Sequence, residues 1–416
     1  MRNALSALLM SCAALVPGTA PAAEVAEAPS PAQRAFIAAK LYGDLALGFA
    51  HWQGAGGLSL DTAVRAYLDK AMTATDRLDF DRETMAFLAK FKNGRTEFAD
   101  AWLDTAYPAL PFTVRRIGQD WVVTASRIDA LKPGDVIAQV NGTATESVYQ
   151  AKARFIAAAS DEARRARLFA LPALLPQPLT LGLADGRSVA IDPAAATPAA
   201  ARETTSKWLK PDQIAYVAIP GFDDPQFEAN AVAAVKSFAQ APTLVIDVRG
   251  NAGGTTPNGL LAALMNRPYR GWAVATAIPS ADPKQHAQIS WPAHKTEPVA
   301  DAYGRQLILL IDGGCTGACE DFVLPFRDNG RAVLIGEPTG GSAGGVLIEN
   351  LGDGMVASIG NSRVSLPDGP PVDGAGMAPD VAVAPKPSDL KAGLDPVIAK
   401  VLIQSEPGAQ QDHRAP

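Results

Sequence analysis

Two glycine-rich turns in the second half of the chain carry the residues best placed for chemistry. The first ends the stretch TLVIDVRGNAGG at 243–254, where an apolar strand precedes Gly253 and Gly254. We expect the N–H groups of these glycines to form an oxyanion hole, the alternative being a plain turn at a strand end. The second is a strand, a tight turn and a helix over 307–330, an arrangement in which enzymes place nucleophiles. The residue at its apex, however, is Gly317, which has no side chain to react.

Two cysteines flank this apex, Cys315 and Cys319. Two residues along a helix correspond to about 200° of rotation, so a thiol at either position would face away from the oxyanion turn. A disulfide between them requires Cys315 to precede the helix, because Cβ atoms of an i,i+4 pair within a helix are about 5–6 Å apart. A disulfide, inert burial and a catalytic thiol all remain open interpretations.

Composition excludes several classes of function. The 416 residues carry a net charge of −6 and show no basic face, which argues against nucleic-acid binding. The length predicts two or three domains. Four histidines and three cysteines show no metal-ligand spacing, so we expect neither a metal nor a cofactor. We expect the histidines at solvated surface positions: His51, His286, His294 and His413.

The N-terminus has the pattern of an export signal over 1–23. Arg2 precedes an apolar run at 5–16, and Ala-Pro-Ala at 20–22 is a cleavage site of small residues. Cys12 offers a lipoprotein site as the alternative. No later stretch reaches the roughly 20 apolar residues of a membrane span. We therefore expect a periplasmic or secreted protein without an integral span.

The elements that must position the two turns fall into a helical, a β-rich and an α/β region. Ser30-Pro31 should begin the first helix of a domain over 31–103, with Asp61 and Asp81 capping the second and third helices. Strand and hairpin patterns occupy 105–193.

The β-rich region contains LKPGDVIAQVNG at 131–142, which resembles the signature of PDZ domains. That resemblance implies binding of extended peptides by strand addition. Alternating strands and helices over 205–404 then predict an α/β core with parallel strands. A closing helix is expected at 389–404, before a polar tail at 405–416.

Four motifs in this order resemble the tail-specific, or C-terminal processing, serine peptidases and their tricorn-core-like branch: IDVRGNAGG at 246–254, CTGACEDF at 315–322, DNGRAVLIGEPTGG at 328–341 and VDGAGMAPD at 372–380. The resemblance implies a core like that of crotonases and Clp proteases, preceded by a helical and a PDZ-like domain. It also implies an endopeptidase that acts on exported proteins.

At the catalytic positions that the resemblance assigns, this chain departs from the pattern. The nucleophile position is Gly317, and Ser342 stands where processing peptidases have a lysine base. In the tricorn-like branch the base is a histidine, and the matching residue is Arg95, which stays protonated. Asp373 lies where a carboxylate could orient a base, or simply tie down a turn.

Two hypotheses follow, and a third is disfavoured. The chain is either a degenerate peptidase that binds extended or unfolded peptides, or a working endopeptidase with an unusual nucleophile and base. An acyl-CoA enzyme of the crotonase type is disfavoured by the export signal, because that cofactor belongs to the cytoplasm. The sequence leaves the oligomeric state open.

Overall fold

The computed structural model describes residues 26–278 and 288–404. Its first layer is helical, with α1 (Pro31–Gly48), α2 (Leu60–Thr73), α3 (Arg77–Ala89) and the short α4 (Ala101–Ala106). Ser30 caps α1 as predicted, but α2 and α3 are capped by Ser59 and Asp76. The predicted caps were wrong because each helix begins earlier than expected. Asp81 therefore lies within α3, fully buried.

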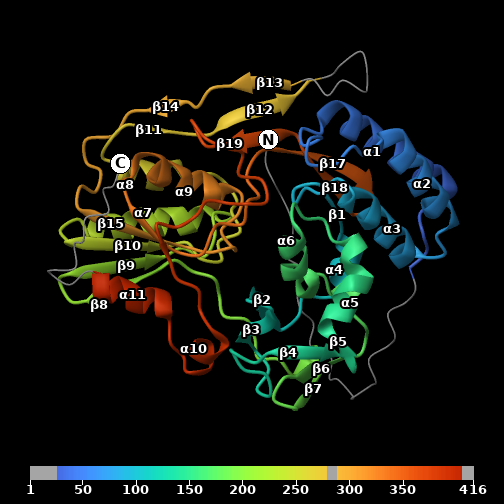
Figure 1. The fold of residues 1–416 in the computed structure, drawn as a ribbon, viewed down its shortest axis with the longest axis horizontal. Coiled ribbons are helices and arrows are strands. Elements are labelled where there is room, and N and C mark those ends of the chain that lie inside the picture. The colour runs from blue at the N-terminus through green and yellow to red at the C-terminus, as the bar shows by residue number, and fades with distance from the viewer. Residues whose placement is uncertain (1–25, 279–287, 405–416) are drawn as a thin grey trace, which may run out of the picture.

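The helices pack on a three-stranded antiparallel sheet whose strands come from distant parts of the chain. Its order is β1 (Glu97–Asp100), β18 (Met355–Gly360) and β17 (Val346–Gly352). Glu97 pairs with Ser358 across β1 and β18. The helical region and the α/β region, predicted as separate domains, therefore share a sheet (Figure 1).

The β-rich region lies at the opposite end of the molecule from the strands β12 (Ala273–Ala277) and β13 (Gln288–Trp291) (Figure 1). It comprises β2 (Phe112–Ile117), β3 (Asp120–Ser126), β4 (Ile137–Val140), β5 (Thr143–Ala144), α5 (Thr145–Lys152), α6 (Asp161–Ala166), β6 (Leu179–Leu183) and β7 (Ser188–Ile191), with short 3₁₀ turns at Ala153–Phe155, Leu168–Ala170, Pro172–Leu174 and Pro193–Ala195. The strands form a β2-β3 pair and a sheet of order β5-β4-β6-β7. Its buried side chains are continuous with those beneath the helical layer.

The predicted α/β core contains a six-stranded sheet of order β20-β16-β15-β10-β9-β8. Its strands are β8 (Thr205–Lys210), β9 (Ile214–Ala218), β10 (Thr243–Asp247), β15 (Gln306–Ile311), β16 (Val333–Gly336) and β20 (Val381–Ala382). All neighbours pair in parallel except β8 and β9.

Helices cover both faces of this sheet (Figure 1). One face carries α7 (Pro225–Ser237), α8 (Asn258–Leu264) and α9 (Ala318–Asn329), and the other carries α11 (Pro396–Gln404). Leu244 and Ile246 of β10 point to the first face and Val245 to the second. The two-residue alternation of a strand explains why β10 is apolar throughout.

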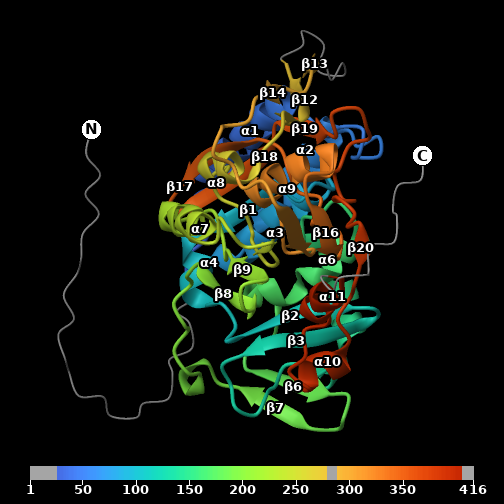
Figure 2. The ribbon, with the colours of Figure 1, turned by 90° about the vertical axis from the view of Figure 1, so that its left-hand side faces the viewer.

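Two features depart from the sequence prediction. The expected closing helix is broken into α10 (Pro387–Lys391) and α11, and Gly393 between them has φ +66°. Figure 2 shows α10 beside the β-rich region, where Lys391 approaches Asp135. The sequence also did not predict several strands, namely β1, β5, β8, β17, β18 and β20 together with β11 (Tyr269–Arg270), β12, β13, β14 (Lys295–Thr296) and β19 (Ser362–Ser365).

Candidate functional site

The apex of the site is a sharp turn between β15 and α9. Gly317 has φ 56° and ψ −123°, and α9 begins at the next residue. A strand-to-helix turn of this strained kind presents a nucleophile in many hydrolases. Asp312 fixes the turn, since its Oδ1 accepts hydrogen bonds from Gly314 N (2.9 Å) and from Gly250 N (2.8 Å) on the neighbouring loop. The backbone therefore has the shape expected of a catalytic turn, without the reactive side chain.

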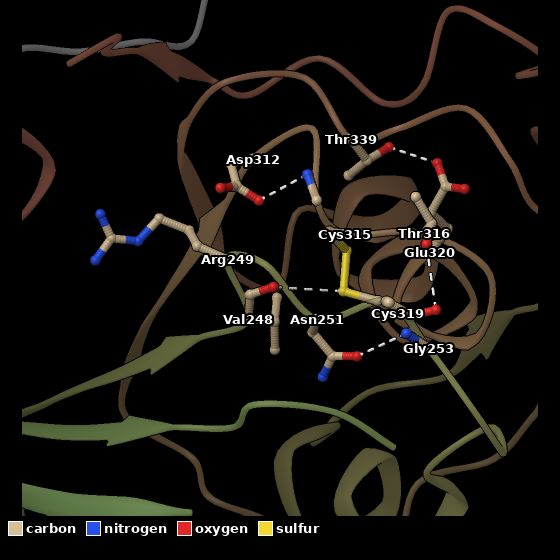
Figure 3. The surroundings of a disulfide bond; sticks show 12 residues. Val248, Arg249, Asn251, Gly253, Asp312, Cys315, Thr316, Cys319, Glu320 and Thr339 are labelled. Carbon is tan, nitrogen blue, oxygen red and sulfur yellow. Dashed lines mark hydrogen bonds between the residues drawn. A yellow bond between two sulfur atoms is a disulfide. The ribbon is translucent and has the colours of Figure 1, made fainter. Parts of the chain in front are cut away.

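A disulfide joins Cys315 and Cys319 across this turn (Figure 3). Cys315 lies before α9, and the Cα atoms are 5.3 Å apart, within the range that a bridge allows. Both residues are fully buried. Of the three interpretations, the structure shows the disulfide, which leaves no free thiol at the turn to act as a nucleophile.

Arg95 lies directly against the apex. Its Nη1 donates a hydrogen bond to the carbonyl oxygen of Ser342 (2.9 Å), and it would lie only 3.2 Å from a Cβ atom added at Gly317. The N–H of Gly317 donates to the same carbonyl (3.2 Å). The structure thus brings together three positions, 95, 317 and 342, that the sequence comparison had assigned to base and nucleophile.

Arg95 is held by the turn that follows α3. The side-chain oxygen of Asn93 accepts hydrogen bonds from Arg95 N (3.0 Å) and from Thr96 Oγ1 (3.1 Å). Thr96 Oγ1 in turn accepts the N–H of Gly360 at the end of β18 (3.0 Å). These hydrogen bonds between the helical layer and β18 fix the position of the Arg95 backbone, and so the point from which its side chain extends.

Ser342 belongs to a loop that is anchored by a buried carboxylate. Glu320 accepts hydrogen bonds from Thr339 Oγ1 (2.6 Å), Gly341 N (2.9 Å) and Ser342 N (2.7 Å). Burial raises the pKa of the Glu320 carboxyl, and these three donors oppose the rise. Figure 3 shows the contact with Thr339. Ser342 thus contributes its backbone to the site and has no group that can serve as a lysine-like base.

The predicted oxyanion turn is only partly available. Gly253 and Gly254 have φ values of 92° and 135°, but Gly253 N donates to Asn251 Oδ1 (2.9 Å). A Cβ atom at Gly253 would lie 2.6 Å from the Thr316 carbonyl oxygen, so the two loops touch here and only glycine fits. The prediction that Gly253 offers its N–H to a ligand was wrong, because Asn251, buried beneath the loop, accepts it.

The first turn of α9 supplies a backbone donor at the same place. Ala318 is the first residue of α9, so its N–H has no acceptor within the helix. Ala318 N would lie 2.8 Å from a Cβ atom at Gly253, which places it at the junction of the two glycine loops. The sequence had marked this helix N-terminus but not this residue.

Sequence reasoning also missed a histidine–carboxylate pair beside the loop of Ser342. His51 Nδ1 lies 2.9 Å from Asp373 Oδ2, and the residue is 4% exposed rather than solvated as predicted. Its Nε2 is buried and has no hydrogen-bond partner among the described residues. The only local signal was the position of His51 between apolar residues at the end of a helix. His294 is exposed as expected, and His286 and His413 lie outside the described residues.

Two cavities meet at the guanidinium of Arg95. The larger, of about 600 Å³, lies between the sheet β1-β18-β17, the segment 158–167 and the loops at the apex. The smaller, of about 300 Å³, extends past Gly317 toward β12 and β19. Arg95 lines both. Within the described part of the chain, no group of three or more His, Cys, Asp or Glu side chains is arranged to hold a metal ion.

Comparison with known proteins places the core in a family. Residues 213–383 match the sequence profile described as Peptidase family S41. This part of the chain belongs to peptidase family S41. The predicted resemblance is thereby confirmed. The S41 region contains the apex at Gly317 and both glycine loops, whereas Arg95 and His51 lie before it.

Curated relatives agree with this assignment. The chain is 30% identical over 173 residues to a carboxyl-terminal-processing protease of Picosynechococcus sp., covering 39% of this chain and 38% of that protein. It is 26% identical over 191 residues to a chloroplastic C-terminal processing peptidase of Tetradesmus obliquus, covering 43% of this chain and 37% of that protein. The match thus spans less than two fifths of either relative's length.

Solved structures extend the likeness in fold to nearly the whole chain. Mature CPAF superposes with a TM-score of 0.71 at 13% identity, covering 90% of this chain and 98% of CPAF. A photosystem II D1 C-terminal processing protease gives a TM-score of 0.53 at 18% identity, covering 84% and 92%. The multidomain α/β fold expected from the sequence is therefore the one observed.

In the β-rich region, α6 packs against the pair of strands β2 and β3. Among the described strands, β2 pairs with β3 alone, and α6 contacts both of them. Trp121 of β3 donates its Nε1–H to Arg165 O in α6 (3.3 Å), and Arg116 of β2 pairs with Glu162 of α6 (3.4 Å). No described helix combines the length and the apolar character needed to cross a membrane.

Proposed function

We propose that this S41-fold chain binds extended peptides and does not hydrolyse them by the serine-peptidase route. One observation carries the proposal: Arg95 Nη1 lies 3.2 Å from the position of a Cβ atom at Gly317. The place of a nucleophile is empty of any side chain, and the group beside it cannot accept a proton. Nucleophile and base act as a unit, and losing one costs about 10⁶-fold in turnover.

Peptide binding is supported by the wall of the larger cavity. Val346 and Ile348 of β17 line it, and β17 pairs on one side with β18 and on the other with no described strand. The face of β17 lines the cavity, and its edge without a described partner strand lies next to that face, where an extended segment can be added. The family's action on peptide bonds agrees with a cleft of this kind.

A working endopeptidase with an unusual nucleophile is the second candidate, favoured by the His51–Asp373 pair. This pair has the arrangement of a base and its orienting carboxylate. Against it, no described hydroxyl or thiol forms a hydrogen bond with His51 Nε2. Thr316 Oγ1 instead donates to Ala252 O (3.2 Å).

The two candidates are separated by labelling the wild-type protein with a fluorophosphonate and by incubating it with denatured casein. We expect no label, no cleavage, and micromolar binding of extended peptides, corresponding to about 8 kcal/mol. Label on the wild-type protein that disappears in Ser342→Ala or Thr316→Ala would identify an unusual nucleophile and refute the inactive assignment. If no member of a broad peptide library binds more tightly than millimolar, the peptide-binding function is wrong.

We also propose that the protein is exported. The pattern at 1–23 lies outside the described residues, and the support is that pattern together with the disulfide at the apex. Structural disulfides are rare in reducing compartments. Mass spectrometry of protein from its native cell should show a new N-terminus near Ala22, or a lipid on Cys12. An intact Met1 would contradict export by this signal.

A further inference from the structure

We propose that Arg95, beside the N-terminus of α9, binds the free C-terminal carboxylate of an extended peptide that lies in the larger cavity. This inference rests on the proposed peptide-binding function and adds the chemical group that the site recognises. In an active peptidase this point holds a peptide bond that is to be cut. Here the surrounding groups fit the terminal carboxylate of a peptide.

The first support is that Arg95 is a cation without an anion. Its one hydrogen bond from the guanidinium goes to the neutral carbonyl of Ser342, and no described carboxylate forms an ion pair with it. Its Nε is buried and has no hydrogen-bond partner among the described residues. A guanidinium offers five N–H donors in a planar fork that matches a carboxylate. Because Nε is buried, the donors available to a ligand are the remaining N–H groups of Nη1 and Nη2.

The charge of Arg95 is uncompensated within its own cavity. Arg167, the other arginine that lines the larger cavity, pairs with Glu97 and also donates to Ala157 O (2.6 Å). Glu97 is the one acidic residue in the described lining of that cavity, and Arg167 satisfies it. The charged side chains that line the cavity thus sum to one positive charge, that of Arg95.

The N-terminus of α9 adds positive electrostatic potential near Arg95. Ala318 presents the first N–H of a 12-residue helix beside Gly317, and helix N-termini favour anions. The two acidic residues of the first turn already have donors. Glu320 is bound within the loop of Ser342, while Asp321 accepts from Trp272 Nε1 (2.7 Å) and faces the smaller cavity. Arg95 lines both cavities, whereas Ala318 lines the smaller one. A carboxylate in the larger cavity therefore meets Arg95 and lies next to the positive end of α9.

The walls of the larger cavity indicate what precedes the carboxylate. One wall is the face of the sheet, where Glu97, Ser358 and Ile348 lie in register across β1, β18 and β17. The opposite wall is lined by small side chains: Ala158, Ala159, Ala163 and Ala166. An extended peptide with small or medium apolar side chains near its end fits between these walls.

The inference is tested with three forms of one probe, an N-acetylated octapeptide of alternating serine and valine that ends in valine. The forms carry a free C-terminal acid, a C-terminal amide, or an amide with the final valine replaced by aspartate. Each is titrated by calorimetry against the wild-type protein, Arg95→Gln and the control Arg65→Gln, which removes an exposed charge from α2. We expect the free acid to bind the wild type at least tenfold more tightly than either amide. This preference should vanish in Arg95→Gln and persist in Arg65→Gln.

Each other outcome overturns a defined part of the inference. Equal binding of acid and amide would leave the peptide-binding function intact and refute the carboxylate receptor. Failure of all three forms to bind would refute the peptide-binding function itself. Binding of the aspartate form as tight as the free acid would assign the site to side-chain carboxylates rather than chain ends. A preference that persists in Arg95→Gln would place the receptor elsewhere, and the wild-type comparison still decides if that variant does not fold.

Discussion

Rebuilding the catalytic pair tests the assignment of Gly317 and Arg95 most directly. In Gly317→Ser alone, the new Cβ would lie 3.2 Å from Arg95 Nη1, at a φ of 56° that disfavours any residue with a side chain. Such backbone strain costs about 1–3 kcal/mol. The hydroxyl would also face a group that cannot deprotonate it. We expect the single variant to be inactive and to unfold at lower urea concentration.

The double variant Gly317→Ser with Arg95→His removes the close contact and supplies a base. Full recovery is not expected, because Asp373 is already bound by His51 at 2.9 Å and the new histidine lacks an orienting carboxylate. Loss of the whole triad costs about 2 × 10⁶-fold, and loss of the carboxylate alone about 3 × 10⁴-fold. The ratio of these two losses predicts that the turnover of the double variant is roughly 10²-fold higher than that of the wild type.

The assay is fluorophosphonate labelling together with cleavage of denatured casein, for the wild type, both single variants and the double variant. The expected order has the double variant labelled and the other three unlabelled. Strong activity in Gly317→Ser alone would show that another group acts as base, and that position 95 was assigned wrongly. A folded double variant without label would refute the inference that the turn keeps a catalytic shape.

Three further perturbations follow from the buried groups. Replacing both Cys315 and Cys319 by alanine should lower the free energy of unfolding by about 2 kcal/mol in urea denaturation, since the bridge closes a very short loop; no change would show that the bridge does not form. Burial raises the pKa of Asp81 to about 9 from 3.8, so the native state holds a proton more tightly than the unfolded state. Stability should then fall as pH rises from about 4 to about 9, by up to about 1.4 kcal/mol per pH unit. Asp81→Asn should flatten that slope, whereas the exposed control Asp69→Asn should keep it; a flat wild-type profile would contradict the shift. Glu320→Ala should cost about 3 kcal/mol or more in the same urea assay, because three buried donors lose their acceptor; a loss below 1 kcal/mol would mean that water replaces the carboxylate.

The local elements of this chain were readable from the sequence because short-range physics determines them. The helix that starts after Gly317 ends at Gly330, which has φ 61°, as its glycine predicted. Buried strands such as β10 and β15 appear as unbroken apolar runs because helices cover both faces of the sheet. The ordered motifs also sufficed to predict the S41 family and its fold.

The partners of the site's side chains could not be read in this way. Arg95 meets the carbonyl of Ser342, 247 residues later in the chain, and His51 meets Asp373 at a separation of 322 residues. No local pattern encodes such contacts, because they depend on how the helical layer is set against the core. The sequence placed both cysteines beside the apex but left their bridge open, since it depends on where α9 begins.

The amide of Gly253 shows the same difference between what the local sequence determines and what tertiary packing decides. The sequence predicted a turn at this glycine, and the turn is there, with a φ of 92°. Whether its N–H faces a ligand depended on a third group, the side chain of Asn251, which lies 2.9 Å away and accepts it. The sequence determined the turn because glycine alone tolerates that backbone. Only the tertiary structure decided which hydrogen bond the turn makes, because a buried polar side chain takes the nearest donor that the packing leaves to it.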